Sequence, residues 1–121
     1  MKINPYRKIL IIGASGNIGY PLYKSLKNNF YTLGTYNENY KKNLIKFDVN
    51  KDKLSIILKN NKFTDLILCQ GIINFNKIST NPGLAKKTNL DSLVLQLKTI
   101  KKENNLKIIY FSSESIFDGQ N

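Results

Sequence analysis

Apolar residues fall in short runs that are separated by segments with helical spacing. The runs at residues 9–12 and 66–69 contain no polar alternation. Such runs are typical of strands that are covered on both faces, as in a parallel sheet. Three further apolar segments, at residues 30–35, 44–47 and 107–111, also have the length of strands. The pattern therefore predicts five strands.

The segments between these strands predict helices. The first begins near Asn17 and continues to residue 29. Its apolar face is expected to contain Ile18, Leu22 and Leu26. A second helix is expected over residues 52–61, and a long third helix from Pro82, which suits a first helical turn, to about residue 104. Because strands and helices alternate, we expect one α/β domain over residues 1–121, with a parallel sheet and right-handed crossovers.

The first apolar run leads directly into a glycine-rich segment, GASGNIG, at residues 13–19. Gly13 permits a sharp turn, Gly16 lets a phosphate approach the backbone, and Gly19 lets the next helix pack closely on the strand. The helix N-terminus offers unpaired N–H groups and a positive dipole end, which favour a bound pyrophosphate. The alternative is a glycine-rich turn with no ligand. No Gly-Lys-Ser/Thr follows, which excludes the phosphate loop of NTPases.

Composition narrows the classes of chemistry and partner. The sequence has no histidine, which removes Ser-His-Asp and Cys-His catalysis and most zinc sites, so we predict no metal site. Its one cysteine, Cys69, offers no disulfide framework, and a cytoplasmic location is expected. No apolar stretch approaches ~18 residues, so no membrane partner is expected. The formal net charge of +11 comes from scattered lysines, which favours a solvated basic surface over nucleic-acid binding.

Three motifs, in the same order along the chain, resemble those of the extended short-chain dehydrogenase/reductase superfamily. GASGNIG is similar to the family's GxxGxxG, and FDVN at residues 47–50 to its Asp-hydrophobic pair after the third strand. SSESIFDG at residues 112–119 is similar to its Ser-Thr-Asp-Tyr-Val-Phe-Asp-Gly signature. Within the superfamily the chain resembles the N-terminal part of the dTDP-4-dehydrorhamnose reductase group of nucleotide-sugar reductases. The resemblance implies a Rossmann-type doubly wound parallel sheet with flanking helices and strand order 3-2-1-4-5, truncated after strand 5.

The resemblance also implies a nicotinamide-dinucleotide site at the carboxyl edge of the sheet. The expected cofactor contacts are Gly13, Ser15, Gly16, Asn17, Ile18, Gly19, Thr35, Tyr36, Asp48, Val49, Gln70 and Gly71. Asp48 would contact the adenine through its carboxylate and Val49 by packing, although Asp48 also suits a cap for the following helix. Cys69 and Gln70 depart from the family's usual Asn-Ala-Ala. Asn89 falls where the superfamily often has an asparagine, or is an ordinary polar helix position.

One catalytic position is matched and another is missing. Ser113 takes the place of the family's catalytic Ser/Thr, whose hydroxyl orients and polarises a keto oxygen, although a serine at a strand end is the alternative. The family's Tyr-x-x-x-Lys, which supplies the general acid, follows the fifth strand, and the sequence stops before it. Tyr20 and Lys24 have that spacing but lie in the first predicted helix. We expect the chain as given not to complete the reductase cycle alone.

The residues after the second strand favour NADP, with NAD as the alternative. NAD-binding members usually place an acid at the end of this strand, for the ribose hydroxyls. Residues 35–37 are Thr, Tyr and Asn, with Glu38 one step later and Lys41 and Lys42 beyond it. The lysines would suit an additional phosphate, whereas Glu38 would suit NAD.

The sequence therefore predicts the NADP-binding portion of a nucleotide-sugar reductase or epimerase, whose full-length form acts on a keto-sugar nucleotide. Two competing hypotheses are a non-catalytic dinucleotide-binding regulatory subunit and a basic nucleic-acid-binding domain. With no helix after the fifth strand, apolar surface near Ile108, Tyr110 or Ile116 should be exposed. Such a surface favours a homodimer or another association through this face.

Overall fold

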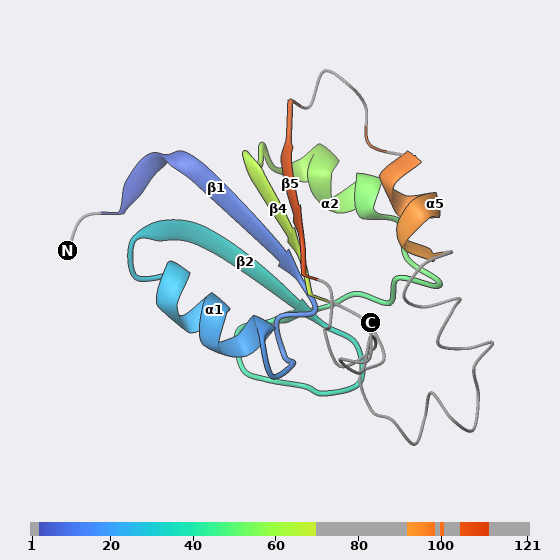
Figure 1. The fold of residues 1–121 in the computed structure, drawn as a ribbon, viewed down its shortest axis with the longest axis horizontal. Helices are drawn as coiled ribbons and strands as arrows, with labels where there is room; N and C mark the ends of the chain where they lie inside the picture. The colour runs from blue at the N-terminus through green and yellow to red at the C-terminus, as the bar shows by residue number, and fades with distance from the viewer. Residues whose placement is uncertain (1–2, 70–91, 99, 101–104, 112–121) are drawn as a thin grey trace, which may run out of the picture.

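The computed structural model describes residues 3–69, 92–98, 100 and 105–111 (Figure 1). Its strands are β1 (Asn4–Ile12), β2 (Phe30–Tyr36), β3 (Ile45–Lys46), β4 (Asp65–Leu68) and β5 (Lys107–Tyr110). Its helices are α1 (Gly19–Leu26), α2 (Leu54–Asn60) and α5 (Ser92–Lys98). The predicted α/β alternation is confirmed over these ranges.

The strands form one parallel sheet in the order β3-β2-β1-β4-β5, which is the predicted order 3-2-1-4-5. The central strand, β1, pairs with β2 on one side and with β4 on the other. The chain therefore runs from β1 to β2 on one side of the sheet and later to β4 on the other side. The loops that follow these strands separate at the carboxyl end of β1. In open α/β sheets this switch point is where ligands bind. The carboxyl ends of β1, β2, β4 and β5 converge there in Figure 1.

The two faces of β1 explain its unbroken apolar run. Leu10 and Ile12 belong to a buried cluster that includes residues of α2 and β4 and is extended by α5. Ile9 and Ile11 belong to a second cluster with Tyr23 of α1. Successive side chains of a strand point to opposite faces, so a strand between two helical layers needs apolar residues at every position. Figure 1 shows α1 on one side of the sheet and α2 and α5 on the other.

Two local expectations were wrong. The helix α1 begins at Gly19 and directs Tyr23 into the core, whereas Ile18 precedes the helix and is 46% exposed. The third strand is limited to Ile45–Lys46. It is short because Asn43 has φ of 74° just before it and the chain begins to turn at Asp48 just after it. Few residues between these turns can therefore pair with β2.

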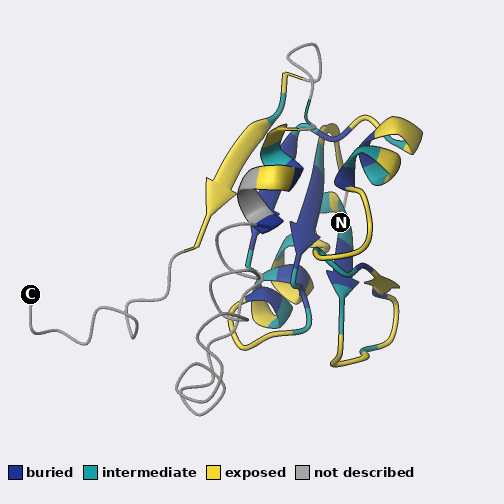
Figure 2. Ribbon diagram, turned by 90° about the vertical axis from the view of Figure 1, so that its right-hand side faces the viewer, coloured by how far each residue is buried: buried dark blue, intermediate teal, exposed yellow. Residues whose placement is uncertain are grey.

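The edge strand β5 is exposed along its length (Figure 2). Ile108 is 43% and Tyr110 47% exposed. The predicted exposed apolar surface near these two residues is confirmed, whereas Ile116 lies outside the described residues. Within the described ranges, no helix is both long and apolar enough to cross a bilayer.

Candidate functional site

The segment between β1 and α1 forms a tight turn at the carboxyl edge of the sheet. Gly13 adopts φ of 83°, a left-handed conformation that glycine adopts without steric cost. A Cβ atom on Gly19 would collide with the Gly13 carbonyl oxygen and would lie 2.9 Å from the Ala14 Cα. The first and third glycines are therefore required by the fold itself, as the sequence predicts.

Gly16 differs from its two neighbours in the motif. It is exposed, and among the described residues a Cβ built there would meet the Gly13 carbonyl oxygen at an ordinary 3.8 Å. The fold therefore does not require a glycine at this position. A ligand that approaches the backbone closely is a separate reason for glycine at this position.

The turn also presents free hydrogen-bond donors. The backbone N–H groups of Asn17, Ile18 and Gly19 donate to no acceptor within the described part of the chain. The N-cap residue of α1, Ile18, makes no side-chain cap, and the first turn of the helix carries no acidic residue. Exposed N–H groups at the positive end of a helix dipole attract an anion such as a phosphate.

Thr35, at the end of β2, holds this turn in place. Its side chain is 1% exposed, and its Oγ1 accepts a hydrogen bond from the Gly13 N–H at 3.1 Å. Its carbonyl oxygen accepts another from the Ala14 N–H at 2.7 Å. Thr35, predicted as a cofactor contact, thus holds the glycine turn through these two hydrogen bonds. Tyr36, the next residue, is half-buried and packs edge-on against the ring of Tyr40 at 5.3 Å.

The loop after β2 brings lysines close to α1. The Lys41 ammonium lies 4.7 Å from the ring centroid of Tyr20, which is in the first turn of α1. The Lys46 ammonium donates to the side-chain oxygen of Asn37 at 2.8 Å and also to its carbonyl. Two cations therefore border the end of β2, which is the position where the sequence predicts selection between NADP and NAD.

The pair Tyr20 and Lys24 has the spacing of the family's catalytic motif, but its environment is that of a helix surface. The Lys24 ammonium lies 4.8 Å from the Tyr20 ring centroid. Tyr23 and Lys27 have the same spacing on the same helix, with the ammonium 5.3 Å from the ring centroid. Residues four apart meet on one face of any helix. The spacing in α1 therefore has a local explanation.

Asp48 and Val49 follow β3 at the same edge. The Asp48 carboxylate accepts a hydrogen bond from the Asn50 N–H at 2.9 Å, and its carbonyl oxygen accepts from the N–H groups of Lys51 and Asp52. Val49 is half-buried against the cluster around Leu10 and Ile12. The expectation that Asp48 caps the following helix is wrong, because α2 begins at Leu54 and its N-cap residue is Lys53. One oxygen of the Asp48 carboxylate instead organises the turn before the helix, and the other has acceptor capacity left for a ligand.

Cys69 follows β4 at the same edge and is half-buried. Desolvation by burial raises the pKa of its thiol from the ordinary 9.0 to about 11. The thiol is therefore neutral at physiological pH and contributes no charge to the site. The predicted contacts Gln70 and Gly71, the predicted catalytic Ser113, and Asn89 lie outside the described residues.

Gln96 of α5 is a buried polar residue near the site that was not predicted from the sequence. This side chain is 9% exposed and makes three hydrogen bonds to the backbone of residues 49–54. A signal was present, because Gln96 interrupts the helically spaced apolar positions that include Leu97 and Ile100. A polar residue on an apolar stripe indicates a buried partner. The spacing of the apolar residues does not identify the group to which Gln96 is hydrogen-bonded.

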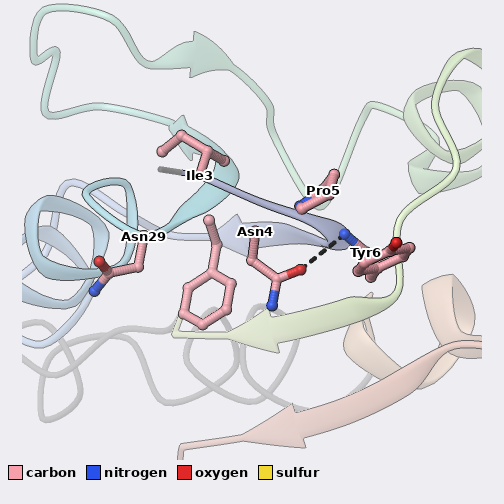
Figure 3. Close-up of a pocket in the computed structure, with 6 residues that line it drawn as sticks. Ile3, Asn4, Pro5, Tyr6 and Asn29 are labelled. Carbon is pink, nitrogen blue, oxygen red and sulfur yellow. Dashed lines mark hydrogen bonds between the residues drawn. The ribbon is translucent and has the colours of Figure 1, made fainter. Parts of the chain in front are cut away.

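Other parts of the described surface offer less. An open depression lined by Ile3, Asn4, Pro5, Tyr6, Asn29 and Phe30 lies at the amino end of β1 (Figure 3). Its polar groups are partly used within the chain, since the Tyr6 N–H donates to the Asn4 side chain at 2.8 Å. The described residues contain no cluster of three or more side chains suited to hold a metal ion. The carboxyl edge is therefore the candidate site.

Comparison with known proteins bears on the fold. A hypothetical dTDP-4-dehydrorhamnose reductase from Sulfolobus tokodaii superposes with a TM-score of 0.80 at 23% identity, over 94% of this chain and 42% of that chain. The chain shares its fold. A UDP-N-acetylglucosamine 4-epimerase from Methanobrevibacter ruminantium gives a TM-score of 0.74 at 21% identity, over 100% of this chain and 41% of the other. The predicted Rossmann-type fold, and its resemblance to these nucleotide-sugar enzymes, are confirmed.

A monomeric L-threonine 3-dehydrogenase from a metagenome has 27% identity and a TM-score of 0.68, over 83% of this chain and 34% of that chain. The chain thus spans well under half the length of each of these proteins. No family model and no curated protein matches the sequence.

Proposed function

We propose that this chain binds a nicotinamide dinucleotide at the carboxyl edge of its sheet. The observation that carries the proposal is the turn at residues 13–19. Within the described ranges, three N–H groups of this turn have no acceptor and lie beside an uncapped helix, and a Cβ on Gly16 would meet no close contact, so the fold needs no glycine there. The pyrophosphate would bind these N–H groups, and the adenosine would extend toward Asp48 and Val49.

The proposal further specifies NADP over NAD. Lys41 and Lys46 border the end of β2, and the acid that follows the strand, Glu38, is exposed. A phosphate on the adenosine ribose would meet these cations, and charge-assisted contacts to phosphate are stronger than neutral ones. This excess of positive charge favours NADP, which carries the additional phosphate, over NAD.

The substrate class is proposed from the fold shared with reductases and epimerases of nucleotide sugars. In this proposal the chain is the cofactor-binding portion of such an enzyme, and the Ser113 hydroxyl polarises the keto oxygen of the sugar. Because the sequence has no Tyr-x-x-x-Lys after its fifth strand, residues 1–121 alone are expected to bind the cofactor without transferring hydride. Mixing the chain with NADPH and a keto-sugar nucleotide should leave the NADPH fluorescence unchanged.

Calorimetric titration with NADPH and with NADH tests the proposal. The wild-type chain should bind NADPH. The Gly16→Asp variant should not bind it, because the Asp carboxylate would lie where the phosphate binds and would repel its negative charge. A Cβ on Gly16 would meet no close contact among the described residues, so the variant should remain folded, which its melting curve checks. A folded wild-type chain that binds neither nucleotide would refute the proposed function.

A further inference from the structure

Gln96 links α5 to the segment that carries Asp48 and Val49. Its Oε1 accepts a hydrogen bond from the Leu54 N–H at 2.9 Å. Its Nε2 donates to the carbonyl oxygens of Val49, at 3.1 Å, and Asp52, at 2.5 Å. Each of these three atoms belongs to the backbone. One side chain from a distant part of the sequence therefore fixes both ends of residues 49–54.

These hydrogen bonds need an amide specifically. Lys53, the N-cap residue of α2, supplies no side-chain cap, so the Leu54 N–H depends on Gln96 for its acceptor. The two carbonyl oxygens need a donor at nearly the same place. A glutamine supplies an acceptor and two donors, whereas an ionised glutamate supplies acceptors only. The position therefore requires a side chain of this size that both donates and accepts hydrogen bonds.

The segment held by Gln96 fixes the orientation of Asp48. The Asp48 N–H donates to a carboxylate oxygen of Asp52 at 2.7 Å, and the Asp48 carboxylate accepts from Asn50. The Ser92 hydroxyl, also on α5, donates to the side-chain oxygen of Asn50. Asp48 thus belongs to a closed turn that α5 holds at several points. If the contacts from α5 were lost, the Asp48 carboxylate would lose its fixed position.

We propose that Gln96 is a positioning residue for the adenosine end of the bound dinucleotide. The inference rests on the proposed function and deepens it. Gln96 itself is buried behind the turn and does not touch the nucleotide. It acts by holding Asp48 and Val49 where the adenine would lie, so its loss should weaken contacts at the adenosine end and leave those at the nicotinamide end unchanged.

The test compares Gln96→Glu with Leu95→Ala, a change on the adjacent residue of α5, whose side chain is 68% exposed. The probes are adenosine 2′,5′-bisphosphate and reduced nicotinamide mononucleotide, which represent the two ends of NADPH. Gln96→Glu should bind the adenosine probe about tenfold more weakly, the effect of losing one or two hydrogen bonds at the loop, and the nicotinamide probe as the wild type does. Leu95→Ala should bind both probes normally.

A second measurement separates the two ways of failing. Amide hydrogen exchange of the unliganded proteins should show faster exchange at residues 48–54 in Gln96→Glu and unchanged exchange in β1. If the wild type binds the adenosine probe and Gln96→Glu binds it equally well, or if both probes weaken together, the positioning role is refuted and the proposed function stands. If the wild type binds neither NADPH nor the adenosine probe, both proposals are refuted, and faster exchange in Gln96→Glu would mark Gln96 as a purely structural contact.

Discussion

The buried hydroxyl of Thr35 accepts a hydrogen bond from the backbone N–H of Gly13 at 3.1 Å. This contact joins the end of β2 to the turn that follows β1, and the Ala14 N–H adds a second bond to the Thr35 carbonyl. A glycine-rich turn is intrinsically mobile because glycine has wide conformational freedom. The neighbouring strand therefore supplies the rigidity that the turn lacks.

Replacing Thr35 with valine tests this support. The change keeps the shape of the side chain and removes the acceptor, which leaves the Gly13 N–H unpaired at a cost of about 1–3 kcal/mol in the free energy of unfolding. Thr32→Val on the same strand is the matched control, because the Thr32 hydroxyl donates to the Phe30 carbonyl two residues away and, in the described part of the chain, to nothing in the glycine turn. Urea denaturation measures both, and equal effects of the two variants would contradict the role of Thr35.

Substitutions at Gly19 and Gly16 should differ in their effects on the free energy of unfolding and on NADPH binding. Gly19→Ala should reduce the free energy of unfolding by about 2 kcal/mol or more, because its Cβ would overlap Gly13 and Ala14. Gly16→Ala should change it by less than about 0.5 kcal/mol, since among the described residues its Cβ makes only an ordinary contact, 3.8 Å from the Gly13 carbonyl oxygen. Gly16→Ala should nevertheless weaken NADPH binding in calorimetry. Wild-type affinity in Gly16→Ala would leave the glycine there without a ligand-based explanation.

Lys41 should contribute to the preference for NADPH. Lys41→Gln is expected to weaken NADPH binding by up to about fivefold, the size of an exposed ion pair, and to leave NADH binding unchanged. Lys59→Gln removes the same charge from the exposed end of α2 and controls for net charge. Raising the salt concentration should reduce the difference between NADPH and NADH. A loss of NADH affinity equal to that of NADPH would show that Lys41 does not select the phosphate.

The thiol of Cys69 should react slowly in the native protein. Burial raises its pKa from 9.0 to about 11, and the thiolate is the reactive form. At about pH 8 the thiolate fraction is therefore about a hundredfold smaller in the native than in the unfolded state. Alkylation by iodoacetamide should be slower by a similar factor in buffer than in denaturant, and should accelerate as the pH rises toward 11. Because this is the one cysteine of the sequence, mass spectrometry reads the rate directly.

The exposed strand β5 should promote self-association. Its residues Ile108 and Tyr110 are nearly half exposed, and an edge strand with apolar side chains is a template for pairing. Sedimentation velocity should show concentration-dependent dimers, and Ile108→Lys should shift them toward monomer. Ile56→Lys on α2, where the side chain is 59% exposed, is the control. A wild-type chain that stays monomeric at all concentrations would contradict the expectation.

The sequence by itself determined the sheet and its glycine turn. The apolar run of β1 requires two covered faces, and Gly13 and Gly19 serve the turn as the motif predicts, because backbone conformation and close packing are local properties. It misplaced Ile18, because helical spacing alone does not tell whether a residue precedes the first turn of the helix.

The tertiary structure decided which side chains support the site. Thr35 lies beneath the turn because β1 and β2 pair in one register, and Gln96 reaches residues 49–54 because α5 and α2 cover the same face of the sheet. The partners of Gln96 lie more than forty positions away in the sequence. Hydrogen bonds over such separations depend on how the elements pack, which no local pattern specifies.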